Sequence, residues 1–134
     1  DAAKLGADKF VVSRDADAMG SVAGTFNVII DTVSADHDIN PYINALGLNG
    51  VLVVVGMPET PATVHQASLI LGNKAIAGSL IGGIPETQEM LDFCAKHGIT
   101  SDIELIRPDY IDTAYDRTVK ADVRYRFVID MANA

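Results

Sequence analysis

The sequence has one cysteine, no tryptophan and few basic residues among its 134 positions. A single cysteine excludes an internal disulfide framework, and it excludes a zinc site built from several cysteines of this chain. Ten basic residues against eighteen acidic ones give a formal net charge of −8, which argues against a protein that binds duplex nucleic acid. The same acidic balance would repel a phosphate-bearing ligand unless local dipoles or a few well-placed cations compensate.

Long hydrophobic runs are also scarce. No basic start followed by an apolar core, as in a secretory signal, is visible in residues 1–9. The uncharged stretch 39–58 is about as long as a membrane span, but it contains three Asn, three Gly and two Pro. We therefore expect a helix followed by a buried strand there, and a cytoplasmic protein without a membrane partner. The lone Cys94 fits a reducing compartment, and its place on an apolar helix face suggests a small core residue.

Short β-branched runs alternate with helical stretches over the first hundred residues. The strand candidates are 10–13, 27–31, 51–55 and 74–79, and the helix candidates are 40–46, 64–71 and 85–97, the last stopped by Gly98. The runs 27–31 and 51–55 are apolar on both alternating faces, as expected for parallel strands that helices cover on each side. The pattern predicts an α/β fold with a largely parallel sheet.

The last third of the chain has a different pattern, because residues 102–106 alternate with a period of two. A strand of this kind has one solvent-facing side, which fits a different sheet from the two-sided strands upstream. A helix over 109–120 and a final strand over 125–130 follow. We therefore place a domain boundary near Gly98.

Small or polar residues follow three of the apolar runs, at the strand ends where ligands bind in open α/β sheets. These segments are 31–35, 55–58 and 79–83. Gly56, Gly82 and Gly83 would let backbone amides approach a ligand, although each segment alone could be an ordinary turn. Neither G-x-G-x-x-G nor G-x-x-x-x-G-K-[ST] occurs in the chain. The residues themselves therefore predict an α/β domain with a ligand-binding edge.

Five blocks of residues, 31–35, 55–58, 78–83, 86–94 and 122–128, occur in an order that resembles a known family. Together with 4–8, they resemble the C-terminal part of zinc-dependent medium-chain alcohol dehydrogenases, in particular the cinnamyl-alcohol-dehydrogenase-like branch. The resemblance implies an incomplete Rossmann-type parallel sheet, its second half, over 1–97. Residues 98–134 would then be a strand-helix-strand tail that returns to the catalytic domain. Asp rather than Met at position 1 fits this expectation of a piece of a longer protein.

The resemblance also implies which chemistry lies elsewhere. Members of the family bind NADP(H) on a Rossmann domain whose Gly-rich turn would precede Asp1. Their zinc ions are held by side chains of the earlier catalytic domain, so no catalytic residue and no metal ligand is expected in this chain. His37 matches a frequent histidine of the branch, for which a role at the start of a helix is expected rather than catalysis. Asn73 stands where many relatives have arginine.

Eight positions carry the implied cofactor contacts: Thr32, Val33, Val55, Gly56, Ser79, Leu80, Arg126 and Arg124. The first two would flank the cofactor, the next two would approach the nicotinamide, and the backbone of 79–80 would meet the carboxamide. Arg126 resembles the family's cofactor-facing arginine and Arg124 is the second choice, while a solvated strand charge is the alternative for either.

The resemblance implies a parent enzyme that interconverts primary alcohols and aldehydes by hydride transfer to or from NADP(H), with zinc polarising the oxygen. This chain would be inactive alone. The alternative is a non-catalytic α/β nucleotide-binding or oligomerisation module, since relatives dimerise through the edge near 74–84. In the family's sheet order, absent strands would separate 10–13 from 27–31. The open apolar edge at 27–31 predicts a homodimer or a self-associating fragment.

Overall fold

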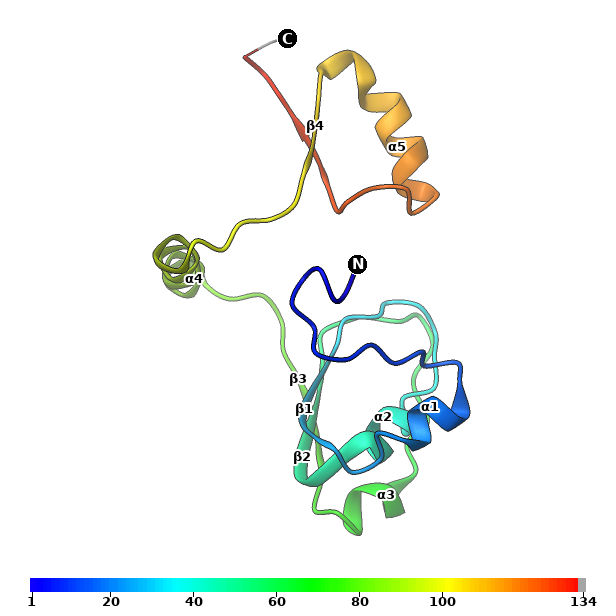
Figure 1. The fold of residues 1–134 in the computed structure, drawn as a ribbon. Coiled ribbons are helices and arrows are strands. Elements are labelled where there is room, and N and C mark those ends of the chain that lie inside the picture. Colours follow the sequence, from blue (N-terminus) through cyan, green and yellow to red (C-terminus); the bar gives the residue numbers. More distant parts are fainter. Residues whose placement is uncertain (133–134) are drawn as a thin grey trace. The chain divides into compact units, whose positions relative to one another are not determined.

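The computed structural model describes residues 1–132 and divides the chain into two compact units, Asp1–Ile81 and a second that begins at Gly82 (Figure 1). The first contains α1 (Ala16–Gly20), β1 (Phe26–Asp31), α2 (Asn40–Ala45), β2 (Leu46–Val54), α3 (Gln66–Ile70) and β3 (Ala75–Gly78). The second contains α4 (Ile84–His97), β4 (Glu104–Ile106), the 3-10 turn η1 (Pro108–Tyr110), α5 (Ile111–Val119) and β5 (Phe127–Ile129). The predicted α/β class with parallel sheets is confirmed.

The three strands of the first unit form one parallel sheet in the order β1-β2-β3. Ile29, Leu52 and Ile76 lie level with one another across the sheet. Helices α1, α2 and α3 lie on the same side of this sheet (Figure 1). Ile29 and Leu52 pack there against Ile39 and Ile43, so the hydrophobic core lies between the sheet and α2.

The opposite face of the sheet is open in this unit. Side chains alternate across a strand, so Val28 and Ile30 lie on the face away from α2, and they are 57% and 64% exposed. Among the described strands, β1 pairs only with β2. The prediction of an open apolar edge at 27–31 is therefore confirmed.

The expected strand at 10–13 is wrong. These residues have no strand conformation, and Phe10 and Val12 are 74% and 51% exposed. An isolated strand leaves its backbone groups without a ladder partner, and no strand of the described residues pairs with this segment. The β-branched composition alone does not make a strand where a partner is lacking.

The first unit contains one helix that the sequence pattern did not predict. Helix α1 begins after Asp15, whose side-chain Oδ1 accepts hydrogen bonds from the backbone N–H groups of Asp17 and Ala18, both at 3.0 Å. This is N-capping, which satisfies backbone donors that have no partner within the helix. The stretch 39–58 forms α2 and β2, as expected, and no helix of the described residues is both long and apolar enough to cross a membrane.

The second unit contains a separate two-stranded parallel sheet, β4-β5, covered by α5. The prediction that this part belongs to a different sheet is confirmed. The alternation in β4 predicted that its polar side would face solvent. Instead, Leu105 is 62% exposed, whereas Glu104 forms an ion pair with Arg117 of α5 at 2.8 Å. Arg117 also lies over the Phe127 ring, 4.9 Å from its centroid. The ion pair with Arg117 thus keeps the Glu104 side chain on the side of β4 that faces α5.

Helix α4 ends where the sequence predicted. Gly98 has a φ of 65°, the left-handed conformation that glycine adopts at helix C-termini. At the other end, the Glu86 side chain accepts a hydrogen bond from the Gly83 N–H at 2.6 Å. Cys94 is only half-buried, and its Sγ lies 3.7 Å from the Met90 Sδ. Within its own unit, Cys94 is therefore not the core residue that its position suggested.

Candidate functional site

The carboxyl ends of β1, β2 and β3 lie side by side, and six of the eight predicted site residues follow them directly. The backbone ladder continues into these residues: the N–H groups of Val55 and Gly56 donate to the Asp31 carbonyl at 2.9 and 3.1 Å, and the Ser79 N–H donates to the Val54 carbonyl at 3.2 Å. Parallel pairing brings the ends together. The structure therefore gathers the predicted pairs 32–33, 55–56 and 79–80 at one edge of one sheet.

Gly56 lies against the backbone that leaves β1. A Cβ atom at this position would come within 2.2 Å of the Val33 carbonyl oxygen and 3.0 Å of the Thr32 carbonyl carbon. The absence of a side chain at Gly56 is thus required by contact between two strand ends. This explains the glycine by packing within the chain, while its contact with a cofactor stays a prediction.

Asp31, the last residue of β1, holds the segment that follows it. Its side chain is buried, its Oδ1 accepts a hydrogen bond from the Val33 N–H at 3.0 Å, and its Oδ2 lies 2.9 Å from the His37 Nε2. The His37 Nδ1 lies 2.8 Å from the Ala35 carbonyl oxygen. The hydrogen bond to Ala35 and the interaction with Asp31 outweigh desolvation and raise the pKa of His37 above 6.5.

The sequence pattern did not single out Asp31 and His37 as a pair. One available signal is the carboxylate at the end of an otherwise apolar strand, because a buried carboxylate needs a partner. The expected place of His37 before a helix agrees with α2, which begins three residues later at Asn40. Its side chain, however, contacts the end of β1 and also lies edge-on to the Tyr42 ring, 5.9 Å between centroids.

Two further aspartates fix the connection between β1 and α2. Asp36 accepts hydrogen bonds from the N–H and Oγ1 of Thr60, which lower the pKa of its carboxyl group. Asp38 accepts from the backbone N–H and the side-chain amide of Asn40, which lower its pKa as well. Residues 36–38 and 60–63 line a hollow of about 420 Å³. Its carboxylates make it an unsuitable place for a phosphate group.

The third strand end is the most open. Ser79 and Leu80 are exposed, and a Cβ atom on Gly78 would meet nothing within 4 Å. Room for a ligand is therefore available beside β3, next to backbone groups that β2 holds in place. Beside Gly82, in contrast, the space is taken by the Glu86 side chain, whose Oε2 would lie 3.2 Å from an added Cβ.

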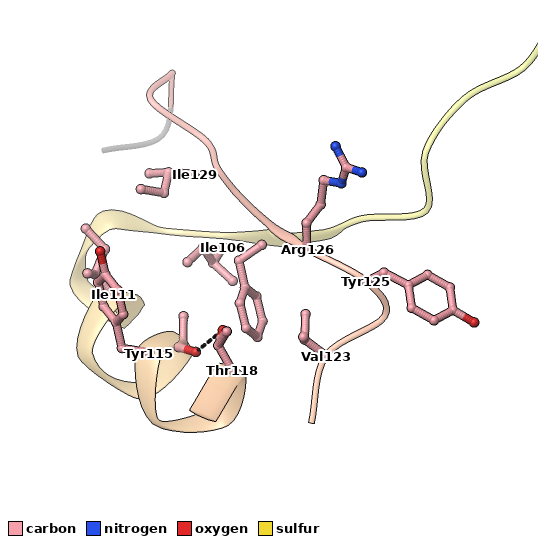
Figure 2. A pocket seen from close by; sticks show the side chains of 10 residues that line it. Ile106, Ile111, Tyr115, Thr118, Val123, Tyr125, Arg126 and Ile129 are labelled. Atoms are coloured by element: carbon pink, nitrogen blue, oxygen red, sulfur yellow. Dashed lines mark hydrogen bonds between the residues drawn. The ribbon is translucent and has the colours of Figure 1, made fainter. Parts of the chain in front are cut away.

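The two predicted arginines belong to the second unit. Arg126 is exposed, and Figure 2 shows its side chain extending away from Ile106 and Val123. Its carbonyl oxygen accepts a hydrogen bond from the Glu104 N–H at 2.9 Å. The backbone N–H of Arg124 donates to the Glu104 Oε1 at 2.9 Å. Both guanidinium groups are thus on exposed residues, and their contact with a cofactor stays a prediction.

The second unit also contains an apolar hollow of about 420 Å³ between α5, β4 and β5 (Figure 2). Ile111, Tyr115 and Thr118 line it from the helix, and Ile106 lines it from β4. The Thr118 hydroxyl donates to the Ala114 carbonyl at 2.8 Å, so its polar group is satisfied within the helix. The hollow is therefore mostly apolar, and Arg126, one of the two predicted arginines, lies among the residues that line it.

The described residues offer no metal site: nowhere among them do three or more His, Cys, Asp or Glu side chains come together in a way that could hold a metal ion. They fit a cofactor better than a metal, because the aligned strand ends present backbone groups and the space beside Gly78 is open. The arrangement can bind and orient a ligand.

The sequence profile of the zinc-binding dehydrogenases matches residues 1–96. A mannitol dehydrogenase from Petroselinum crispum is 57% identical over 130 residues, which are 97% of this chain and 39% of that protein. A solved structure of a cinnamyl alcohol dehydrogenase from Sorghum bicolor matches with a TM-score of 0.91 at 48% identity, over 99% of this chain and 38% of that one. A CAD from Helicobacter pylori complexed with NADP(H) matches with a TM-score of 0.73 at 39% identity, over 87% of this chain and 34% of that one.

The chain thus spans less than two fifths of the length of these relatives. The match to the Sorghum bicolor structure is to its C-terminal part, and the resemblance stated from the ordered sequence blocks is confirmed. Since the family profile covers well over half of the residues, the chain belongs to the zinc-binding dehydrogenase family.

Proposed function

We propose that this chain forms the nicotinamide side of the cofactor-binding domain of an NADP(H)-linked alcohol dehydrogenase. The observation that carries the proposal is the alignment of 32–33, 55–56 and 79–80 at the carboxyl ends of three adjacent parallel strands. Open α/β sheets bind dinucleotides at this edge. The relative solved with NADP(H) supports the same cofactor.

In this proposal, each strand end has a positioning role. Thr32 and Val33 flank the cofactor, Val55 and Gly56 border the nicotinamide side, and the backbone at 79–80 contacts the carboxamide. When bound, NADPH would supply the hydride that reduces an aldehyde, and NADP+ would accept the hydride of an alcohol in the reverse direction. Arg126, with Arg124 as the second choice, supplies positive charge that a phosphate-bearing ligand requires on a chain with a net charge of −8.

The zinc of the family would be held by residues outside this chain. No group of three or more metal-ligating side chains is present in the part that the structure describes, so the residues here do not fit a zinc ion. We assign residues 1–97 to the cofactor-binding domain and 98–134 to the tail that returns to the catalytic domain. A cytoplasmic location and homodimer formation belong to the same proposal.

The substrate class proposed is a small primary alcohol and its aldehyde. The matched relatives are named for different alcohols, mannitol and cinnamyl alcohol, although each resembles this chain closely. Similarity over this chain is thus shared by relatives that are named for different alcohols. Selection of the alcohol is expected in residues of the parent that lie outside the chain.

Cofactor binding by the longer protein that contains this chain tests the proposal. Replacement of Arg126 by Ala should raise the Kd for NADPH by about tenfold, the usual effect of losing one charge-assisted hydrogen bond. Arg107→Ala is the matched control, because Arg107 is an exposed arginine of the same unit, and its Kd should stay at the wild-type value. Equal Kd values for all three proteins would contradict the role of Arg126.

A second measurement separates the enzyme from the non-catalytic module. The longer protein should reduce an aldehyde with NADPH, whereas the 134-residue chain should show no zinc-dependent aldehyde reduction. Tight NADPH binding by the chain alone would favour the nucleotide-binding module instead. Aldehyde reduction by the chain alone would contradict the proposal that the metal chemistry lies elsewhere.

A further inference from the structure

Asp31 connects the first strand end to the second. Its side chain accepts from the Val33 N–H at 3.0 Å and contacts the His37 Nε2 at 2.9 Å. Its carbonyl accepts from the N–H groups of Val55 and Gly56. The side chain of Asp31 is only 7% exposed, so these hydrogen bonds are largely shielded from water. One buried residue thus holds the backbone of two of the three strand-end segments to which cofactor contacts are assigned, 32–33 and 55–56.

Both ring nitrogens of His37 face groups that accept hydrogen bonds. Nε2 lies 2.9 Å from the Asp31 carboxylate and Nδ1 lies 2.8 Å from the Ala35 carbonyl oxygen. A neutral imidazole has one N–H, whereas an imidazolium has two. Only the protonated ring can therefore donate to both partners. When His37 loses this proton, one of the two hydrogen bonds by which its ring connects Ala35 to Asp31 is lost.

Negative charge surrounds this ring. Asp31 contacts it from β1, while Asp36 and Asp38 flank it in the chain; Tyr42 of α2 lies edge-on to it. The hydrogen bond to the Ala35 carbonyl is the largest cause of the raised pKa of His37, and the carboxylates of Asp31 and Asp38 add to it against desolvation. Protonated His37 thus offsets part of an acidic cluster beside the strand ends.

We propose that Asp31 and His37 are positioning residues that hold the segment 32–35 in its cofactor-binding shape, and that the proton on His37 controls the affinity for NADP(H). The inference rests on the proposed function and deepens it. The imidazolium closes the segment by two hydrogen bonds and reduces the repulsion between three aspartates and a phosphate-bearing ligand. The alternative, expected from the sequence, is a role of His37 confined to the start of α2.

The direction of the pH effect follows from the raised pKa of His37. Below about pH 6.5, the ordinary pKa of histidine, the ring is charged and both links are present. As the pH rises through the higher pKa of the folded protein, one link is lost and the net charge at the strand end becomes more negative. Affinity for NADPH should therefore be highest at acidic pH and fall as the pH increases.

Fluorescence titration of NADPH from about pH 6 to about pH 9, on the longer protein that contains this chain, tests the inference. Wild-type affinity should fall by about tenfold, the factor expected for one hydrogen bond to a charged group, with its midpoint above the ordinary pKa of histidine. His37→Gln should bind more weakly at the acidic end and lose this midpoint. Asp31→Asn should shift the midpoint to lower pH, because the carboxylate no longer favours the charged ring.

His97→Gln is the matched control, since His97 is an exposed histidine in the last turn of α4, and it should keep the wild-type profile. Hydrogen exchange of wild-type protein without cofactor gives a second readout that needs no variant. After correction for the intrinsic rate, protection of the Val33 amide should decrease across the same midpoint. A constant protection would overturn the inference.

The outcomes for the two proposals differ. If wild type binds NADPH and His37→Gln has the same pH profile, the inference is overturned while the proposed function stands. If wild type binds no NADPH at any pH, the proposed function fails and the inference fails with it. A profile that His37→Gln flattens and Asp31→Asn shifts supports both, because a role limited to starting α2 would not move a midpoint.

Discussion

At the scale of single residues, the close contact between Gly56 and the backbone of Val33 has a direct consequence for stability. An added Cβ would lie 2.2 Å from the Val33 carbonyl oxygen, and a backbone atom cannot move aside as a flexible side chain can. Gly56→Ala should therefore lower the free energy of unfolding by about 3 kcal/mol, at the upper end of overpacking effects. Chemical denaturation measures this change.

Gly78→Ala is the control for this substitution. Gly78 is the last residue of β3, and a Cβ there would meet nothing within 4 Å. Its φ lies outside the left-handed region, so alanine should change the stability by less than about 1 kcal/mol. Equal effects of the two substitutions would show that these two glycines matter through chain entropy rather than through the contact with Val33.

At the scale of helices and strands, Asn40 joins the start of α2 to the segment before α3. This buried side chain donates to the Asp38 Oδ1 at 2.7 Å and to the Thr63 carbonyl at 2.9 Å, and it accepts from the His65 N–H at 2.9 Å. Asn40→Ala should destabilise the chain by about 2–3 kcal/mol, because buried partners lose their hydrogen bonds. Thermal unfolding of the variant checks this value.

Asn44→Ala tests whether the position in the helix or the hydrogen bonds matter. Asn44 is exposed in the same helix, so its replacement should change stability by less than about 0.5 kcal/mol. A loss of stability as large as that of Asn40→Ala would indicate that α2 depends on helix propensity and not on the link to residues 63–65.

Some features of the strands could be predicted from the sequence, and others could not. Strand ends could be placed because β-branched runs locate parallel strands, and parallel pairing then brings their carboxyl ends together. The strand prediction for residues 10–13 was wrong because a strand forms only where a neighbouring strand pairs with it, and composition does not reveal that neighbour. The exposure of Leu105 could not be predicted either, since the Glu104–Arg117 ion pair joins residues that are distant in sequence. The contact between Asp31 and His37 could not be predicted for a related reason. Neither residue type indicates by itself which loop geometry will bring the two side chains together.

At the scale of the whole molecule, the open face of the first sheet is the feature that most favours self-association. Val28 and Ile30 are largely exposed on it, and β1 is an edge strand among the strands described. An exposed apolar edge strand favours pairing with another chain. The net charge of −8 opposes such pairing by repulsion between copies, and salt screens this repulsion. We therefore expect the 134-residue chain to self-associate more strongly as the ionic strength rises.

Ile30→Lys should weaken this self-association by about tenfold or more, because a charge replaces an apolar side chain whose burial contributes about 1.5–3 kcal/mol. Sedimentation velocity over a range of concentrations gives the association constant. Leu71→Lys is the matched control: Leu71 is 86% exposed at the end of α3 and outside the sheet, so its replacement should leave association unchanged. If the wild-type chain stays monomeric at high concentration and high salt, the open face of β1 does not bind a second copy. If both variants associate equally, the contact lies elsewhere.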